Sequence, residues 1–587
     1  MPHPRTPFVI AAIAALLTAC GGGSGSDAPS PPVDRPYARL IDELQREIPA
    51  AMAEHQVVGL SLALVDDQQV VWQAGFGVRE AGKTDPVSAD TLMRAGSITK
   101  LVTATAVMRL AEHGQFTPDA PLADALPGFH VRSRFHADPA QADREVTLRQ
   151  MLSHHAGLPE TSLAGIGHAP GVVPGNLAQA VQGVHLTYPP GQLLAYSNLA
   201  YDLLGSVIEQ RSGLAYEQYV TTQVLRPLGM TRSTVRTDPT QALAHGHIDG
   251  ASVGTQAEDY DLMPAGGLWS SAGELARFMQ MVFNDGTLDG QTILRPQTLA
   301  QMLTPQHPDN PFDRDSQVGL GWFVTRPEVS GIAPGVAVAQ HDGSTGADHS
   351  ILMLLPQHRL GVVILTNSDT GDAITAPYAE AILRRMWSEK TAQTPPPDPL
   401  LPTSDALAPT PADLTGYPGI YRYTMGESGV LELTSDGARL LLSTPGAAPQ
   451  PLLRDADGWY RVAVDGGLDR ETRLRVDTIG SERALLVERA GRGQATIATR
   501  ISPTPIPPQW LARQGSYDAS DTFHLSLVAE DGWLALVLDD EEVYPLQALD
   551  ANTAVVAGIG RGNGHVIEAA PDGSLRILDL DIPRAAN

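Results

Sequence analysis

Cysteine and lysine are almost absent from this chain of 587 residues. The single cysteine, Cys20, excludes any disulfide bond within the chain. The net charge of −26 excludes a nucleic-acid partner and a basic membrane-binding patch, because both need clustered lysine and arginine. Neither His-Glu-x-x-His nor a Cys/His metal pattern occurs in the sequence, so we predict no metal and no cofactor.

Long apolar runs are missing as well, apart from one near the N-terminus. Arg5 followed by the apolar stretch 9–17 is typical of a secretion signal. Leu17-Thr18-Ala19-Cys20 then resembles a bacterial lipobox, in which the cysteine carries the lipid. The alternative is an ordinary signal peptide with a chance cysteine. Because glycine and not aspartate follows Cys20, the resemblance implies a periplasm-facing lipoprotein of the outer membrane.

The length predicts several domains, and composition indicates where they divide. Gly/Ser/Pro-rich and Pro-rich stretches are typical of linkers, and the segments after residue 412 show short alternating strands with weak internal repetition. A linker of this kind predicts a tail that is separate from the rest of the chain. We expect a signal peptide (1–20), a tether (21–38), a main domain (39–390), a linker (391–412) and two β-barrel-like modules (413–501 and 502–587).

The main domain is predicted to be an α/β (α+β) fold. Apolar residues at helical spacing indicate a helix across 40–52, and alternation from Val58 indicates a strand that forms a hairpin with Val70–Trp72. A mostly helical middle follows, and strands return at 335–340, 350–355 and 361–366 before a helix across 373–387. We therefore expect one antiparallel sheet, built from both ends of the domain and flanked by helices.

Ser97-Ile98-Thr99-Lys100 is the strongest chemical signal. Residues three apart share one helix face, so the Lys100 amine is expected beside the Ser97 hydroxyl. Arginine outnumbers lysine strongly in this chain, but arginine cannot give up its proton, whereas a buried lysine titrates near neutrality. A retained lysine in an apolar helix therefore indicates catalysis. A structural salt bridge at Lys100 is the alternative.

Two further motifs follow in order. Tyr196-Ser197-Asn198 comes after a Pro-Pro-Gly turn, and His341-Asp342-Gly343-Ser344 ends a strand pattern. Together with Ser97 and Lys100, they resemble the three motifs of serine β-lactamases, penicillin-binding proteins and related esterases. The Tyr-x-Asn form is similar to the branch with class C β-lactamases and D-aminopeptidases. The resemblance covers about residues 39–388, and Thr147–Pro159 adds to it.

The resemblance implies a role for each motif residue. Ser97 attacks the carbonyl of an ester or amide substrate, while Lys100 and Tyr196 hold and move the proton. Tyr196 needs cationic neighbours to ionise near neutrality, and His341 is a possible second one beside Lys100. The resemblance also implies that the substrate is bound by Asn198, Gly343 and Ser344. It implies that the backbone N–H groups of Ser97 and Ser344 form the oxyanion hole.

The third motif departs from the family pattern, since histidine stands in place of lysine at 341. Asp342 replaces the hydroxyl residue, and strand alternation turns it away from the cleft. The fixed cation that would bind a substrate carboxylate is therefore lacking. We predict an esterase, with a D-amino-acid peptidase, DD-carboxypeptidase or β-lactamase as alternatives. An inactive scaffold that serves as an envelope binding protein is the alternative of another class.

A second serine motif competes with this interpretation. Gly250-Ala251-Ser252-Val253-Gly254 fits the G-x-S-x-G pattern of α/β hydrolases. That motif requires a hydrophobic strand before the serine and a helix after it. Here a segment rich in histidine and glycine precedes it, so we interpret the match as a coincidence.

Overall fold

The structure is a computed structural model of the whole chain. It describes residues 36–585 apart from 162–176, 256–262 and shorter gaps, of which 402–405, 425–429 and 558–563 are the longest. The lipobox and most of the tether lie outside the described residues. No helix in the described part is long and apolar enough to cross a membrane.

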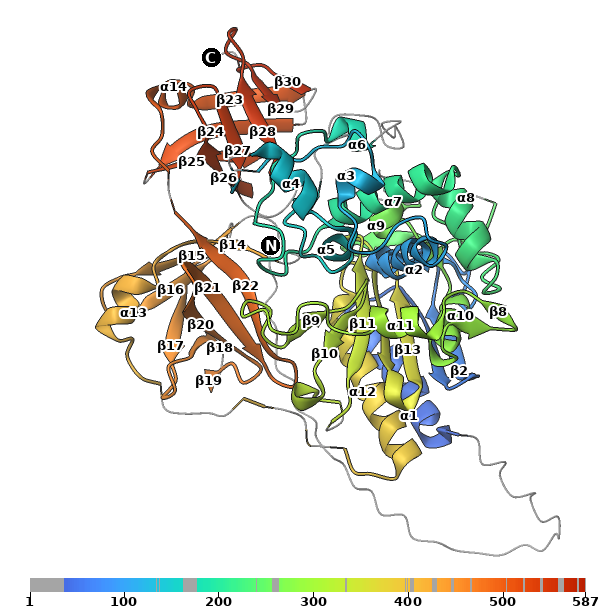
Figure 1. The fold of residues 1–587 in the computed structure, drawn as a ribbon. Coiled ribbons are helices and arrows are strands. Elements are labelled where there is room, and N and C mark those ends of the chain that lie inside the picture. The colour runs from blue at the N-terminus through green and yellow to red at the C-terminus, as the bar shows by residue number, and fades with distance from the viewer. Residues whose placement is uncertain are drawn as a thin grey trace, which may run out of the picture.

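One seven-stranded antiparallel sheet organises the main domain (Figure 1). Strand β1 pairs with β13 from the other end of the domain, with Leu60 opposite Thr366, as predicted. The first hairpin and the strands predicted at 350–355 and 361–366 are also where the sequence placed them, whereas the strand predicted at 335–340 is displaced toward the C-terminus and spans Val338–Ser344. In sheet order the strands are β2 (Gln69–Gly77), β1 (Gly59–Asp66), β13 (Leu360–Thr366), β12 (His349–Leu355), β11 (Val338–Ser344), β10 (Phe323–Thr325) and β9 (Ser316–Val318).

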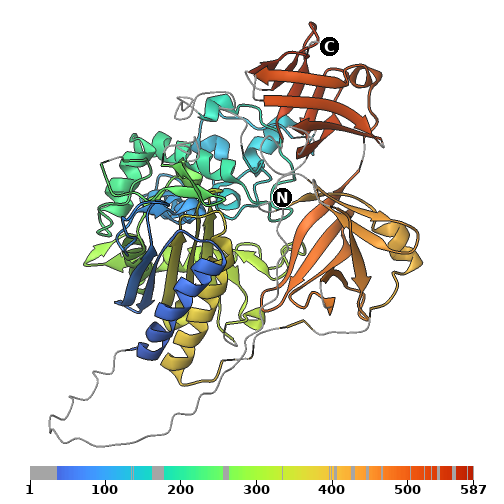
Figure 2. The ribbon, with the colours of Figure 1, turned by 180° about the vertical axis from the view of Figure 1, so that it is seen from behind.

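Helices cover both faces of this sheet. Helices α1 (Ala38–Glu54) and α12 (Asp372–Thr391) lie side by side on one face (Figure 2). The apolar side chains of α1 at helical spacing, among them Leu44 and Ile48, are buried in one apolar cluster with residues of α12 and of strands β1, β12 and β13. Helices α2 (Thr99–Glu112) and α10 (Ala272–Phe283) pack on the other face.

A mostly helical subdomain lies over the end of the sheet that carries α2. Nearly every residue of α2 is buried there, because helices pack around it on several sides. The other helices are α3 (Leu122–Ala125), α4 (Pro139–Glu145), α5 (Leu148–Leu152), α6 (Leu177–Ala180), α7 (Asn198–Ser212), α8 (Tyr216–Val220), α9 (Met263–Gly266) and α11 (Pro296–Met302). The short 3₁₀ turns are η1 (Gly96–Ile98) before α2, η3 (Pro327–Val329) between β10 and β11, and η4 (Pro356–His358) between β12 and β13, while the π-helical turn η2 (Thr221–Leu225) continues α8.

Three two-stranded pairs complete the domain. They are β3 (Met93–Arg94) with β6 (Trp269–Ser270), β4 (Gly246–Ile248) with β5 (Ala251–Gly254), and β7 (Thr287–Leu288) with β8 (Gln291–Thr292). The first pair leads directly into the turn that holds Ser97.

The tail forms two successive β-barrels, which the sequence predicted as barrel-like modules. In the first barrel, β14 pairs with both β15 and β22, and β17 pairs with β18, so eight strands close into a ring. Its strands are β14 (Gly419–Tyr423), β15 (Val430–Ser435), β16 (Leu440–Ser443), β17 (Gln450–Arg454), β18 (Tyr460–Val464), β20 (Thr472–Ile479), β21 (Glu482–Arg489) and β22 (Gly493–Ile501), with the short β19 (Gly467–Leu468) paired to β18.

The second barrel repeats this plan. Its eight strands pair in chain order, and a bridge between Tyr517 and Arg584 closes the ring. They are β23 (Gly515–Ser520), β24 (Phe523–Glu530), β25 (Trp533–Leu538), β26 (Glu542–Ala548), β27 (Thr553–Val556), β28 (Val566–Ala569), β29 (Leu575–Ile577) and β30 (Leu580–Ile582). Short helices α13 (Pro411–Gly416) and α14 (Pro508–Leu511) precede the two barrels.

One hydrogen bond marks the internal repetition of the barrels. The Tyr421 hydroxyl donates to the Tyr417 carbonyl four residues before it, and the Tyr517 hydroxyl donates to the Arg513 carbonyl in the same way, both at 2.7 Å. The weak internal repetition that the sequence indicated after residue 412 thus includes a structural equivalence between residues 417–421 and 513–517.

Candidate active site

Ser97 and Lys100 meet at the start of α2. Ser97 lies in the turn η1, two residues before α2 begins at Thr99, and its side chain is half-buried. The Lys100 amine donates hydrogen bonds to Ser97 Oγ at 3.0 Å, to Asn198 Oδ1 at 2.6 Å and to the Ala265 carbonyl at 2.8 Å. An ammonium group has three protons to donate, so these three acceptors fix the orientation of the amine and hold its nitrogen next to Ser97.

The surroundings of Lys100 make its amine titratable near neutral pH. The side chain is completely buried, and desolvation lowers its pKa from the ordinary value to about 7. The charges of Asp202, Glu160 and Asp342 oppose this shift, but they do not overcome burial. None of the acceptors bound to the amine is a carboxylate, which disfavours the salt-bridge alternative.

Tyr196 lies beside both Ser97 and Lys100. Its hydroxyl forms a hydrogen bond with the Ser97 side chain, and the Lys100 amine lies 4.8 Å from the centre of its ring. Burial of the phenol raises the pKa of Tyr196 well above its usual range, more than the bond to Ser97 lowers it. Tyr196 is therefore a neutral phenol at pH 7.

Asn198 joins Lys100 to a carboxylate that the sequence did not single out. Its Oδ1 accepts from Lys100, while its Nδ2 donates to Glu160 Oε1 at 2.7 Å. The Glu160 carbonyl in turn accepts the backbone N–H of Asn198 at 2.6 Å. Asn198 is the first residue of α7, and the Ser197 hydroxyl caps that helix through the Ala200 N–H. The amide is held in one orientation.

Strand β11 brings the third motif to the same place, and it extends through Ser344, beyond the predicted end at residue 340. The His341 ring is buried, and its Nδ1 bonds to the Asp342 carbonyl at 2.7 Å. Desolvation lowers the pKa of His341 to about 4, so it is neutral at pH 7. The expectation of a cationic His341 beside Tyr196 is therefore wrong. The Asp342 side chain is exposed on the opposite side of the strand, as the alternation predicted.

Two glycines allow β11 to touch the turn that carries Ser97. A Cβ added to Gly343 would lie 2.2 Å from the Ala95 carbonyl oxygen and 3.0 Å from Ser97 N. One added to Gly96, whose φ is +50°, would lie 2.8 Å from Ser344 N. The backbone nitrogens of Ser97 and Ser344 therefore belong to two segments in direct contact, which is the arrangement expected of an oxyanion hole.

The first barrel also reaches the site. The backbone N–H of Tyr196 donates to the Thr424 carbonyl at the end of β14, at 2.9 Å. The Arg422 guanidinium lies 3.9 Å from the centre of the Tyr188 ring, and Thr496 Oγ1 donates to the Phe312 carbonyl at 2.6 Å. The prediction that the tail is separate from the motifs is therefore wrong.

An apolar cluster explains why the barrel docks there. Four buried residues of the main domain pack against four of the barrel, and the group is Tyr188, Leu193, Ala195, Phe312, Trp459, Ile479, Ala484 and Leu486. Burial of a leucine, isoleucine or phenylalanine side chain such as those in this cluster is favourable by about 1.5–3 kcal/mol. The second barrel contacts the neighbouring segment, where its Gly564 carbonyl accepts the His185 N–H at 3.0 Å.

Other groups that the sequence raised as rivals are not catalytic arrangements. Ser252 of the G-x-S-x-G match lies on the β4–β5 hairpin, not on a strand-to-helix turn. His245 approaches both Ser252 at 3.1 Å and Glu80 at 3.7 Å with the same Nδ1, so it cannot relay a proton between them. Among the described residues, no three His, Cys, Asp or Glu side chains are placed to hold a metal ion.

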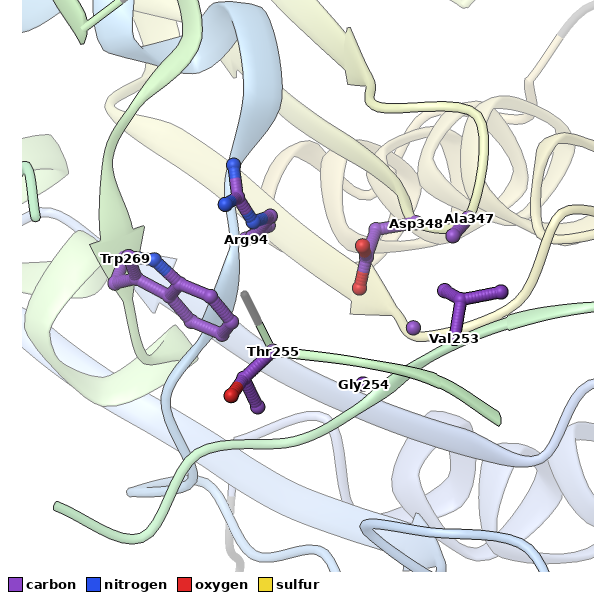
Figure 3. A pocket seen from close by; sticks show the side chains of 8 residues that line it. Arg94, Val253, Gly254, Thr255, Trp269, Ala347 and Asp348 are labelled. Carbon is purple, nitrogen blue, oxygen red and sulfur yellow. The ribbon is translucent and has the colours of Figure 1, made fainter. Parts of the chain in front are cut away.

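A small hollow lies beside the strand that precedes Ser97 (Figure 3). Arg94 lies over the Trp269 ring at 5.0 Å, and Trp269 and Asp348 lie on opposite sides of the hollow. The motif residues are not among those described as lining it. The reactive arrangement is therefore the one around Ser97 and Lys100.

Comparisons with known proteins agree with this geometry. Residues 44–385 match the family described as Beta-lactamase. Penicillin-binding protein 4 of Amycolatopsis lactamdurans is 28% identical over 64% of this chain and 96% of its own length. The D-alanyl-D-alanine-carboxypeptidase/endopeptidase AmpH of Escherichia coli is 29% identical over 53% of this chain and 80% of its own.

Solved structures share the fold. SurE with D-Leu superposes with a TM-score of 0.56 at 24% identity, over 78% of this chain and 99% of its own. The octameric penicillin-binding protein homologue from Pyrococcus abyssi superposes with a TM-score of 0.50 at 21% identity, over 86% of this chain and 99% of its own. Because the family match spans more than half of the chain, the protein belongs to the β-lactamase family and is a serine hydrolase.

Proposed function

We propose that this hydrolase is a carboxylesterase that forms an acyl-enzyme on Ser97. The observation that carries the proposal is the state of His341. A buried neutral imidazole stands where the resemblance expects a lysine, so the third motif supplies no fixed positive charge for a substrate carboxylate. Glu160, bonded to Asn198 on the other side of the site, adds a negative charge. Both features favour an acyl donor without a carboxylate next to the scissile bond.

Lys100 is the general base of the proposed mechanism. With a pKa of about 7, roughly half of the amines are unprotonated at neutral pH, and the amine lies 3.0 Å from Ser97 Oγ. As Ser97 attacks the carbonyl carbon, its proton passes to Lys100. The Tyr196 phenol is bonded to the same oxygen, and it passes a proton to the leaving alkoxide while Lys100 restores it. Water then hydrolyses the acyl-enzyme by the reverse transfer.

The oxyanion of each tetrahedral intermediate would accept hydrogen bonds from the backbone N–H groups of Ser97 and Ser344. The close contact that Gly96 and Gly343 permit supports this assignment. Each such donor contributes about 3 kcal/mol to stabilisation of the transition state. Asn198 would position the substrate, with its amide already held by Lys100 and Glu160.

A D-alanyl-D-alanine carboxypeptidase is the second candidate, because the relative AmpH, which is 29% identical to this chain, is named for that activity. One panel discriminates the candidates: p-nitrophenyl butyrate, nitrocefin, a D-alanyl anilide and an acylated peptide that ends in D-Ala-D-Ala, each with wild type and Ser97→Ala. We expect Ser97-dependent turnover of the butyrate ester and slow or no turnover of nitrocefin. If kcat/KM for nitrocefin, the anilide or the D-Ala-D-Ala peptide exceeds that for the ester by orders of magnitude, the esterase proposal is wrong.

We also propose that the enzyme is anchored in the cell envelope through lipid on Cys20, with its domains facing the periplasm. The lipobox Leu17–Cys20 supports this, and glycine after the cysteine favours the outer membrane. The Cys20→Ala variant is expected to lose membrane association in fractionated cells. Wild type that is found wholly in the soluble fraction would contradict the anchor.

A further inference from the structure

His154 forms hydrogen bonds with the backbone on both sides of Tyr196. Its carbonyl accepts the N–H of Ala195 at 2.8 Å, and its Nδ1 accepts the N–H of Ser197 at 3.1 Å. Its ring also stacks on the Tyr196 ring, with centroids 4.3 Å apart and planes 29° apart. One residue therefore holds the peptide before Tyr196, the peptide after it and the aromatic ring itself.

The backbone of His154 is in a conformation that side chains seldom adopt. Its φ is +59°, in the left-handed region, where the chain reverses just after α5. Such a backbone conformation is strained for a residue with a side chain, and it persists where the surrounding structure determines it. The His154 side chain is 1% exposed, so packing and the two backbone bonds hold it there. Without this reversal the ring could not face Tyr196.

The hydrogen bond from Ser197 also determines the protonation state of His154. Because Nδ1 accepts an N–H, the ring carries its proton on Nε2 and is neutral. Burial lowers the pKa of His154 well below its ordinary value, and positive charge on Lys100, or on His341 and His155 when they are protonated, acts in the same direction. The phenols of Tyr196 and Tyr201 also face the ring. His154 thus adds no positive charge beside Lys100.

We propose that His154 is a positioning residue, which holds the Tyr196 phenol against Ser97 by its two backbone bonds and its ring stack. This inference rests on the proposed role of Tyr196 in proton transfer. His154 acts through Tyr196, since its carbonyl and its Nδ1 bind the N–H groups of Ala195 and Ser197, and the closest of its described ring contacts is the stack on Tyr196. Substitution of His154 is therefore expected to lower the acylation rate constant and to leave the affinity for substrate unchanged.

Three substitutions separate the two kinds of contact. His154→Asn keeps an acceptor for Ser197 N–H and suits the left-handed backbone, but it loses the stack. His154→Phe keeps an aromatic ring but leaves that N–H without its acceptor. His154→Ala loses both. Because a displacement of about 1 Å costs up to ~10²-fold in rate, we expect about a 10-fold loss of the acylation rate constant for Asn and Phe and ~10²-fold for Ala.

Single-turnover acylation by p-nitrophenyl butyrate, in the full chain, measures these effects. The substrate concentration for half-saturation is expected to stay unchanged. The acid limb of the pH profile, which is the fall in the acylation rate below about pH 7, is also expected to stay unchanged, because Lys100 and not His154 titrates there. His307→Asn is the matched control: His307 stacks on His155 at 3.8 Å, and its described ring contacts do not include Tyr196.

Each outcome decides between roles. Normal acylation in folded His154→Ala would overturn the inference, as would a selective rise in the half-saturating concentration. Disappearance of the acid limb in His154→Asn would make His154 the titrating base instead. Ester turnover that survives Ser97→Ala would refute the proposed function itself, and it is measured separately from the His154 series.

Discussion

The backbone N–H of Tyr196 donates to the carbonyl of Thr424, a residue of the first barrel, at 2.9 Å. The bond joins the second catalytic motif to a domain that lies beyond a Pro-rich linker. With His154 bound to the peptides on either side, every backbone N–H from Ala195 to Ser197 has an acceptor outside the Tyr196 loop. The barrel therefore belongs to the active site, although it contributes none of the three motifs.

Weakening the barrel interface is predicted to lower catalysis. Arg422→Met removes the guanidinium that stacks on Tyr188, and Thr496→Val removes the bond to the Phe312 carbonyl. A cation–π contact of this kind contributes about 0.5–2 kcal/mol. We expect the double variant to lose about 10-fold in kcat/KM, since Thr424 then no longer holds Tyr196 in place.

The second barrel offers a matched control for this variant. Arg513 also stacks on an aromatic ring, that of Trp510 at 5.1 Å, but within its own barrel. Arg513→Met is expected to keep kcat/KM unchanged while it lowers the thermal stability to a similar extent. Equal activity losses in the two variants would mean that general destabilisation, and not the Thr424 contact, is responsible.

Lys100→Arg tests the general base. Arginine keeps the positive charge, but it does not give up a proton at any accessible pH. We expect acylation to fall by at least ~10²-fold, the scale of general-base catalysis. The measurement is burst or single-turnover kinetics with p-nitrophenyl butyrate, beside thermal unfolding to establish that the variant is folded. Near-normal acylation would show that Lys100 only provides charge.

Glu160→Gln is predicted to move the acid limb of the pH profile. The Glu160 charge raises the pKa of Lys100, in opposition to burial, so removing that charge lowers the pKa. More of the amine is then unprotonated at a given acidic pH, and the half-maximal point of kcat/KM shifts from near 7 to a lower pH. Glutamine keeps an oxygen for the Asn198 amide, which preserves the geometry.

The control for this shift is Glu217→Gln. Glu217 is an exposed carboxylate that pairs with Arg236 and is not among the charges that act on Lys100. Its removal is expected to leave the acid limb in place. An unchanged profile in Glu160→Gln would mean that another group determines the limb, and a shift to higher pH would contradict the sign of the electrostatic argument.

Local patterns in the sequence predicted much of this architecture. Helical spacing placed Lys100 beside Ser97, and alternation placed the sheet strands and turned Asp342 outward. The state of His341 could not be predicted, because burial determines it and burial depends on the whole fold. Glu160 and Thr424 carry no motif. Their roles follow from tertiary contacts, and the only signal near Glu160 was its place directly after the segment 147–159.

The last prediction concerns Gly343, where a single methyl group is expected to separate the two sides of the oxyanion hole. An alanine Cβ at this position would lie 2.2 Å from the Ala95 carbonyl oxygen and 2.4 Å from Ser350 Oγ, so β11 must move away from η1. The Ser344 N–H moves with the strand, while Ser97 N stays with the helix. Loss of one donor costs about 10²–10³-fold in kcat, and we expect Gly343→Ala to fall in that range while it remains folded.

Gly266→Ala is the control for the added methyl group. Gly266 lies next to Ala265, whose carbonyl binds Lys100, but a Cβ there meets no atom within 4 Å. This variant is expected to keep wild-type kcat. Because the oxyanion donors act on transition states, Gly343→Ala should lower kcat more than it raises KM. A Gly343→Ala enzyme with unchanged kcat would show that the contact between β11 and η1 is not required for the oxyanion hole.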